Sequence, residues 1–256
     1  MTQKLSLYGF NNLTKNLSLS LYKVSYIPSD VAIGEYNTYI NNLYNSDLLT
    51  NWLTHIAQAI GGNVLNIASQ DYSPQGASVT LMISEEAEPE SLVAHLDKSH
   101  ICIHTYPEDS PQNGIAIFRA DIELSTCGVI SPLNILNYII EEFSADVMDI
   151  DFRIRGMTRN NKGEKCFNDM NINNLSEYLT LQTKKTYQIY EGNSLINNTW
   201  HASLMRNDIK WENQVVTGTE NTASDTYNKA SNVPSDRDCP EVIDKVRKEL
   251  YQLFKK

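Results

Sequence analysis

The chain has few cysteines, no long apolar run and no excess of positive charge. Only four cysteines occur in 256 residues, and no two share CxxC spacing, so we expect reduced thiols and no disulfide framework. No segment approaches the roughly 18 to 20 apolar residues that span a bilayer, and no signal-peptide apolar core follows the first residues. We therefore expect a cytoplasmic protein without a membrane partner.

The charge balance excludes a broad phosphate-binding surface. The formal net charge is −10, whereas nucleic-acid binding requires clustered Lys and Arg. We therefore expect no nucleic-acid partner. The composition, 41% hydrophobic and 20% charged, is that of a globular protein, and the length suffices for one large domain.

Alternating apolar and polar residues predict several β-strands. Leu17, Leu19 and Leu21 alternate with polar residues, and residues 64–67, 77–83 and 101–104 are expected to form short strands. Two longer stretches, 115–127 and 147–155, are apolar at even positions and mostly polar at odd positions. One face of each should pack on helices, and the polar face should meet water, a second sheet or a second subunit.

Helical periodicity is found between these strands. Helices are expected at 46–60, after the Ser131-Pro132 pair as N-cap and first helical residue, near 175–181 and at 240–254. Residues 215–238 are rich in Thr, Asn, Ser and Asp and are expected to form a flexible loop. The predicted fold class is α+β, a layered sandwich of largely antiparallel strands with helices on one face.

Candidate chemistry gathers in the segment HLDKSHICIHTYPE at residues 95–108. Three of the chain's five histidines lie here, beside Ser99. Histidine transfers protons near neutral pH. A metal site is an alternative, because His100, Cys102 and His104 share one strand face, although the dense spacing of zinc modules is missing.

A second segment, FRADIELSTCGVISP at residues 118–132, places Cys127 at the end of the polar strand face. A thiol with an ordinary pKa near ~8.5 is mostly protonated at pH 7 and can donate a proton. The two segments alone also permit a Cys/His hydrolase. Cys102 is interpreted as structural.

Together the two segments resemble the processing site and catalytic cysteine of the bacterial S-adenosylmethionine decarboxylase family, in its longer, magnesium-activated class. The segments LYGFNNLTK (7–15) and NIASQDYSPQGASVT (66–80) are also similar to this class. The likeness covers about the first 160 residues well and the rest loosely.

The resemblance implies a zymogen that cuts itself between Lys98 and Ser99. Residues 1–98 would become one chain and residues 99–256 a second chain, together forming one catalytic domain. Ser99 would become a pyruvoyl group that forms a Schiff base with substrate, with His104 as proton acceptor for processing and Cys127 as proton donor in decarboxylation. On a regular strand residues 99 and 104 face apart, so we expect Ser99 in a turn before its strand.

The implied reaction converts S-adenosylmethionine to S-adenosylmethioninamine and CO2 for spermidine synthesis. By the same resemblance Tyr106 and Glu108 lie near the adenosine, Mg2+ is the expected activator, and αβ pairs assemble into a higher homo-oligomer. The sequence offers no carboxylate cluster as a metal site. Two alternatives are a non-catalytic S-adenosylmethionine-binding relative that supports an active partner, and a pyruvoyl decarboxylase of another amino acid.

Overall fold

The computed structural model describes residues 12–27, 30–84, 99–109, 114–127, 130–159, 162–166, 172–194, 198–207 and 240–254. Two features expected from the sequence, the flexible loop at 215–238 and the position of Lys98, lie outside these residues.

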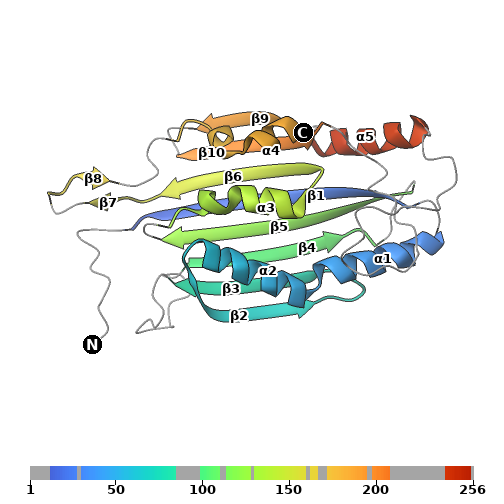
Figure 1. Cartoon of the computed structure of the whole chain (residues 1–256), viewed down its shortest axis with the longest axis horizontal. Helices are drawn as coiled ribbons and strands as arrows, with labels where there is room; N and C mark the ends of the chain where they lie inside the picture. Colours follow the sequence, from blue (N-terminus) through green and yellow to red (C-terminus); the bar gives the residue numbers. More distant parts are fainter. Residues whose placement is uncertain are drawn as a thin grey trace.

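An antiparallel eight-stranded sheet forms the centre of the molecule, in the order β2-β3-β4-β5-β1-β6-β10-β9 (Figure 1). Its strands are β1 (Thr14–Tyr26), β2 (Asn63–Asp71), β3 (Ala77–Ser84), β4 (Ser99–Pro107), β5 (Ile115–Cys127), β6 (Val147–Arg155), β9 (Tyr187–Ser194) and β10 (Thr199–Arg206). A small separate hairpin consists of β7 (Thr158–Arg159) and β8 (Lys165–Cys166). The strands expected at 115–127 and 147–155 are confirmed with those bounds.

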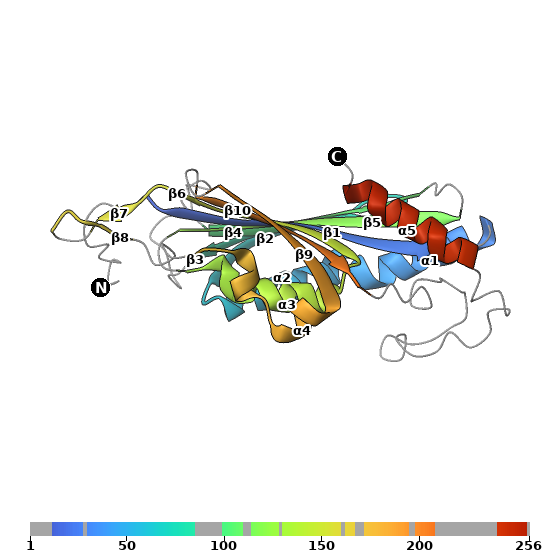
Figure 2. The same ribbon diagram turned by 90° about the horizontal axis from the view of Figure 1, so that it is seen from above.

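Helices cover one face of this sheet and, at one end, the other face. They are α1 (Asp30–Tyr44), α2 (Ser46–Ala59), α3 (Leu136–Phe143), α4 (Leu181–Thr186) and α5 (Pro240–Phe254), with 3-10 turns η1 (Pro132–Ile135) and η2 (Leu175–Tyr178). Figure 2 shows α1 to α4 on one side and α5 on the other. The predicted α+β fold is confirmed, although the helix after Ser131 begins as η1 without a side-chain cap from that serine.

The core lies between the sheet and α1 to α4, because alternate strand residues face these helices. On β1 the odd positions Leu17, Leu19 and Leu21 are at most 1% exposed. On β5 the even positions Ile122 and Leu124 are fully buried. Phe118 stacks on Tyr44 of α1 at a centroid distance of 4.4 Å. The apolar alternation in the sequence therefore corresponds to this interface.

We call the opposite side of the sheet the open face. It carries the polar positions of β1, β4, β5, β6 and β10. Helix α5 covers only one end of it, where its Val246 and Leu250 form a small buried cluster with strand residues. These strand residues are Val24, Ile115, Val147 and Met205.

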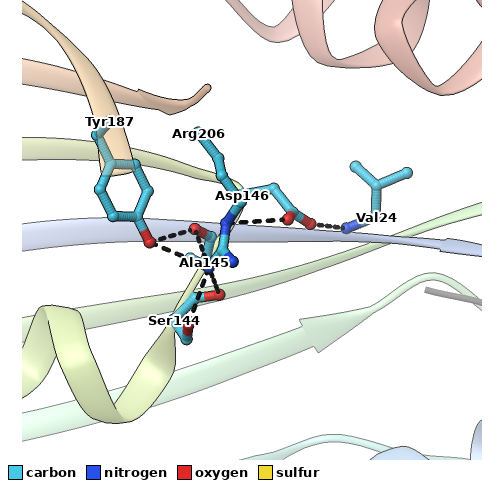
Figure 3. Close-up of polar contacts among 6 residues, drawn as sticks. All are labelled: Val24, Ser144, Ala145, Asp146, Tyr187 and Arg206. Carbon is cyan, nitrogen blue, oxygen red and sulfur yellow. Dashed lines mark hydrogen bonds and ion pairs between the residues drawn. The ribbon is translucent and has the colours of Figure 1, made fainter. Parts of the chain in front are cut away.

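A polar cluster joins the C-terminal hairpin to the centre of the sheet (Figure 3). The guanidinium of Arg206, at the end of β10, donates from Nη2 to the Ser144 carbonyl at 2.6 Å and to the Tyr187 hydroxyl oxygen at 3.1 Å. Its Nε lies 3.7 Å from the Asp146 carboxylate. Asp146 also accepts the Val24 backbone N–H at 2.9 Å. One guanidinium therefore connects β10 and β9 to the residues between α3 and β6.

We expect Arg206→Leu to lower the free energy of unfolding by roughly 2 kcal/mol, since hydrogen bonds made by a charged group at a mostly buried site are lost. Urea unfolding measures the change. The exposed Arg247→Leu on α5 is the control and should change stability by no more than about 0.5 kcal/mol. Equal effects of the two substitutions would contradict a stabilising role for the cluster.

Candidate active site

Ser99 is the first residue of β4, where its backbone pairs with Ile83 of β3. Its side chain is buried, with 6% exposed. The expectation that Ser99 lies in a turn before the strand is therefore wrong. The hydrogen-bonding partner strand β3 extends to Ser84, so β4 begins earlier than the apolar pattern alone indicates. Lys98, the other half of the expected cleavage bond, is outside the described residues.

The fold brings Ser99 and Cys127 together. Antiparallel pairing places His100 opposite Ser125, so the start of β4 lies beside the end of β5. The backbone N–H of Cys127 donates to the Ser99 hydroxyl oxygen at 3.2 Å. Cys127 is partly buried at the last position of β5, and strand alternation directs its side chain to the open face.

His104 lies far from Ser99 within the same chain. The two residues are five positions apart on a continuous strand, which corresponds to roughly 17 Å. Their parity differs, so Ser99 faces the helices while His104 faces the open side. The cross-strand neighbours of His104 are Ser78 on β3 and Asp121 on β5.

Tyr106 lies still further along β4, and Glu108 follows directly after its last residue. Tyr106 is 48% exposed, and the guanidinium of Arg119 stacks over its ring at 4.4 Å. The Glu108 carboxylate accepts the backbone N–H of Ile117 at 2.9 Å. Neither residue contacts Ser99 of the same chain, because more than ~20 Å of strand separates them.

Known proteins with similar sequences decide the family. An S-adenosylmethionine decarboxylase proenzyme from Pseudomonas aeruginosa is 40% identical over 268 aligned positions, which cover 99% of this chain and 97% of the relative. The chain belongs to the S-adenosylmethionine decarboxylase family. The family model described as S-adenosylmethionine decarboxylase matches residues 31–156.

Two further relatives of the decarboxylase family carry the same proenzyme name. The protein from Marinobacter nauticus is 45% identical, with 84% of this chain and 87% of the relative covered. The protein from Alkalilimnicola ehrlichii is 47% identical, with 82% and 83% covered. The resemblance inferred from the two motif segments is therefore confirmed at the level of the family.

The metal-site alternative finds no support in the described part of this decarboxylase-family chain. His100, Cys102 and His104 do alternate on the open face of β4, as the sequence predicted. Nevertheless, among the described residues no group of three or more His, Cys, Asp or Glu could hold a metal ion. Burial, together with the nearby Glu123, raises the pKa of the Cys102 thiol, which agrees with a structural role.

Sequence reasoning missed a polar network beside His104. The Ser20 hydroxyl donates to Asp121 at 2.9 Å, and Arg119 forms an ion pair with the same carboxylate at 3.4 Å. The alternation of β5 had placed Arg119 and Asp121 on one polar face. Ser20 could not be connected to them from the sequence, because this requires knowing that β1 lies next to β5.

A second network on the open face includes His201, to which the sequence assigned no role. Its ring nitrogens lie 2.9 Å from the Asp151 carboxylate and 3.0 Å from the Ser203 hydroxyl. Ser203 donates to Asp149 at 2.6 Å. These residues belong to β6 and β10, so the polar character of the open face continues across the sheet.

Proposed function

We propose that this chain is a self-processing decarboxylase that converts S-adenosylmethionine to S-adenosylmethioninamine and CO2. This reaction supplies the precursor for spermidine synthesis. Membership of the proenzyme family supports this proposal. The observation that carries it is the buried Ser99 hydroxyl beside the Cys127 backbone N–H. This arrangement unites the nucleophile for self-cleavage with the residue assigned to proton donation.

Self-cleavage begins when the Ser99 hydroxyl attacks the Lys98 carbonyl and converts the peptide bond to an ester. Removal of the α-proton of residue 99 then expels the Lys98 carboxylate by β-elimination. The oxygen that leaves is the former Ser99 hydroxyl oxygen, which receives the Cys127 N–H in the structure. A positioned backbone donor stabilises negative charge that develops on such an oxygen. The resulting dehydroalanine is hydrolysed to a pyruvoyl group with release of ammonia.

His104 takes the α-proton, and it does so from a second copy of the chain. Within one chain it faces away from Ser99 and lies roughly 17 Å along the strand. General base catalysis requires hydrogen-bond reach of the proton. The proton to be taken is on the backbone Cα of residue 99, not on its side chain, which faces the helices. Two copies packed open face against open face would place His104 of one copy on the open side of the residue 99 backbone of the other. Tyr106, on the same face two residues further, would accompany His104 to that site and reach the adenosine.

Charge on the open face supports such an assembly. Both signs are present on adjacent strands, so a two-fold arrangement can set opposite charges against each other. The basic residues are Arg119, Arg153 and Arg155, and the acidic residues are Asp121, Glu123, Asp149 and Asp151. The αβ pairs produced by cleavage would therefore function as a homo-oligomer.

Ser99 fits the formation of a pyruvoyl group, because its hydroxyl is buried against a hydrogen-bond donor. At that position the group supplies a carbonyl that accepts electrons when CO2 leaves the substrate. Cys127 then delivers a proton to the substrate carbon from its thiol at the end of β5. The described residues offer no group of ligands that fits an activating Mg2+.

The test of self-processing is the band pattern of purified protein on a denaturing gel. The wild type should give two fragments, corresponding to residues 1–98 and 99–256, and Ser99→Ala should give one band at 29.0 kDa. Ser69→Ala, on the exposed strand β2, is the matched control and should be cut like the wild type. A single band for the wild type would contradict the proposal and favour the non-catalytic relative.

A further inference from the structure

The residue directly across β5 from His104 is a carboxylate, Asp121. The two residues are directly opposite each other in the β4–β5 pairing. Directly opposed residues of an antiparallel pair have Cβ atoms about 4.5–5.5 Å apart and share one face. Ser125, another candidate partner on β5, is opposite His100 instead. The register therefore places one carboxylate within side-chain reach of the imidazole.

The Asp121 carboxylate is fixed from two sides. Ser20 donates to Oδ1 at 2.9 Å from β1. Arg119 lies 3.4 Å from Oδ2 and is itself stacked on Tyr106. A carboxylate accepts up to about four hydrogen bonds, so these contacts leave capacity for another donor. The side chain is 32% exposed, which leaves it accessible from the open face.

Other ionisable groups around His104 are placed less favourably for contact with its imidazole. On β5, Glu123 is opposite Cys102 and therefore diagonal to His104. Arg119 is opposite Tyr106. On β3 the facing residues, Ser78 and Thr80, carry no charge.

We propose that Asp121 is a positioning residue for His104 in self-cleavage, an inference that rests on the proposed function. Asp121 accepts a hydrogen bond from one imidazole nitrogen of His104. The other nitrogen is thereby directed, as acceptor, toward the α-proton of residue 99 in the second copy. The carboxylate also stabilises the imidazolium that forms when the proton is taken, as in other base–carboxylate pairs. Ser20 and Arg119 hold Asp121 in place for this role.

The test uses two co-expressed chains with different tags. The Ser99→Ala chain supplies only His104, and the His104→Ala chain supplies only Ser99. We expect Asp121→Asn in the chain that supplies His104 to slow cleavage of the other chain by about 10- to 100-fold, a part of the 10²–10⁴ that general base catalysis contributes. The same substitution in the chain that supplies Ser99 is the matched control and should leave the rate unchanged.

If Asp121→Asn slows cleavage equally in either chain, its effect is structural and the proposal is overturned. The proposal is also overturned if the substitution slows cleavage in neither chain. If the mixed chains are uncut while the wild type is cut, action on the second copy is refuted, and the positioning role of Asp121 is tested on single chains. There, slow cleavage of Asp121→Asn with restoration in Asp121→Glu, beside normal cleavage of Glu123→Gln, supports the proposal. Identical rates for Asp121→Asn and Glu123→Gln overturn it. An uncut wild type refutes the proposed function itself. A cut wild type with no specific effect of Asp121→Asn refutes only the role of Asp121.

Discussion

Co-expression of a Ser99→Ala chain with a His104→Ala chain should restore self-cleavage that neither chain shows alone. Each chain lacks one group, and a mixed dimer contains one complete site, made of Ser99 from one copy and His104 from the other. Only the His104→Ala chain should be cut. With random pairing about half of the dimers are mixed, so about half of the His104→Ala chains should be cleaved on a denaturing gel.

The same experiment discriminates between two positions for the base. If His104 acted within its own chain, no chain in the mixture would contain both groups, and every band would remain uncut. That result would contradict the face-to-face arrangement. A mixture of the Ser99→Ala chain with a chain carrying both His104→Ala and Ser99→Ala is the control and should give no fragments.

Cys127→Ala should leave self-cleavage intact but impair decarboxylation. Self-cleavage should proceed, because the contact with the Ser99 hydroxyl uses the backbone N–H of residue 127, which alanine retains. Decarboxylation should fall on the order of 10²–10⁴-fold, since the thiol that protonates the substrate carbon is lost. Release of CO2 from carboxyl-labelled S-adenosylmethionine measures the second stage.

Cys102→Ala is the matched control for this prediction. Cys102 also lies on the open face, on β4, but it is opposite Glu123 in the β4–β5 pairing, away from the end of β5 where Cys127 lies. It should keep both cleavage and decarboxylation. Near-normal CO2 release from cleaved Cys127→Ala protein would contradict the assignment of the proton donor.

The strands with one apolar and one polar face could be predicted from the sequence, whereas several other elements, among them β10, β9 and α1, could not. The alternation in β5 and β6 is regular because helices cover only one side of them. In β10, Ala202 to Met205 are all buried, because α5 covers Met205 from the other side, so the alternation is lost. β9 is an exposed edge strand, and α1 carries Gly34 and several polar residues within its helix.

Candidate site residues could be proposed from the sequence, but their arrangement in space could not be predicted. Parity alone showed that residues 99 and 104 face apart. The turn proposed to reconcile them was wrong, because pairing with β3 makes Ser99 part of β4. The position of Asp121 opposite His104 depends on the register between two strands, which local sequence patterns do not determine. The position of Ser99 within β4 and the pairing of Asp121 with His104 therefore depend on contacts between strands that are distant in the sequence.

Intact-mass measurement of the purified wild-type chain tests self-cleavage at Ser99 most directly. We predict two polypeptides, one ending at Lys98 and one beginning with a pyruvoyl group at position 99. Their summed mass should equal that of the full chain plus one water and minus one ammonia. A single polypeptide with an unmodified serine at position 99 would contradict self-cleavage and the pyruvoyl mechanism.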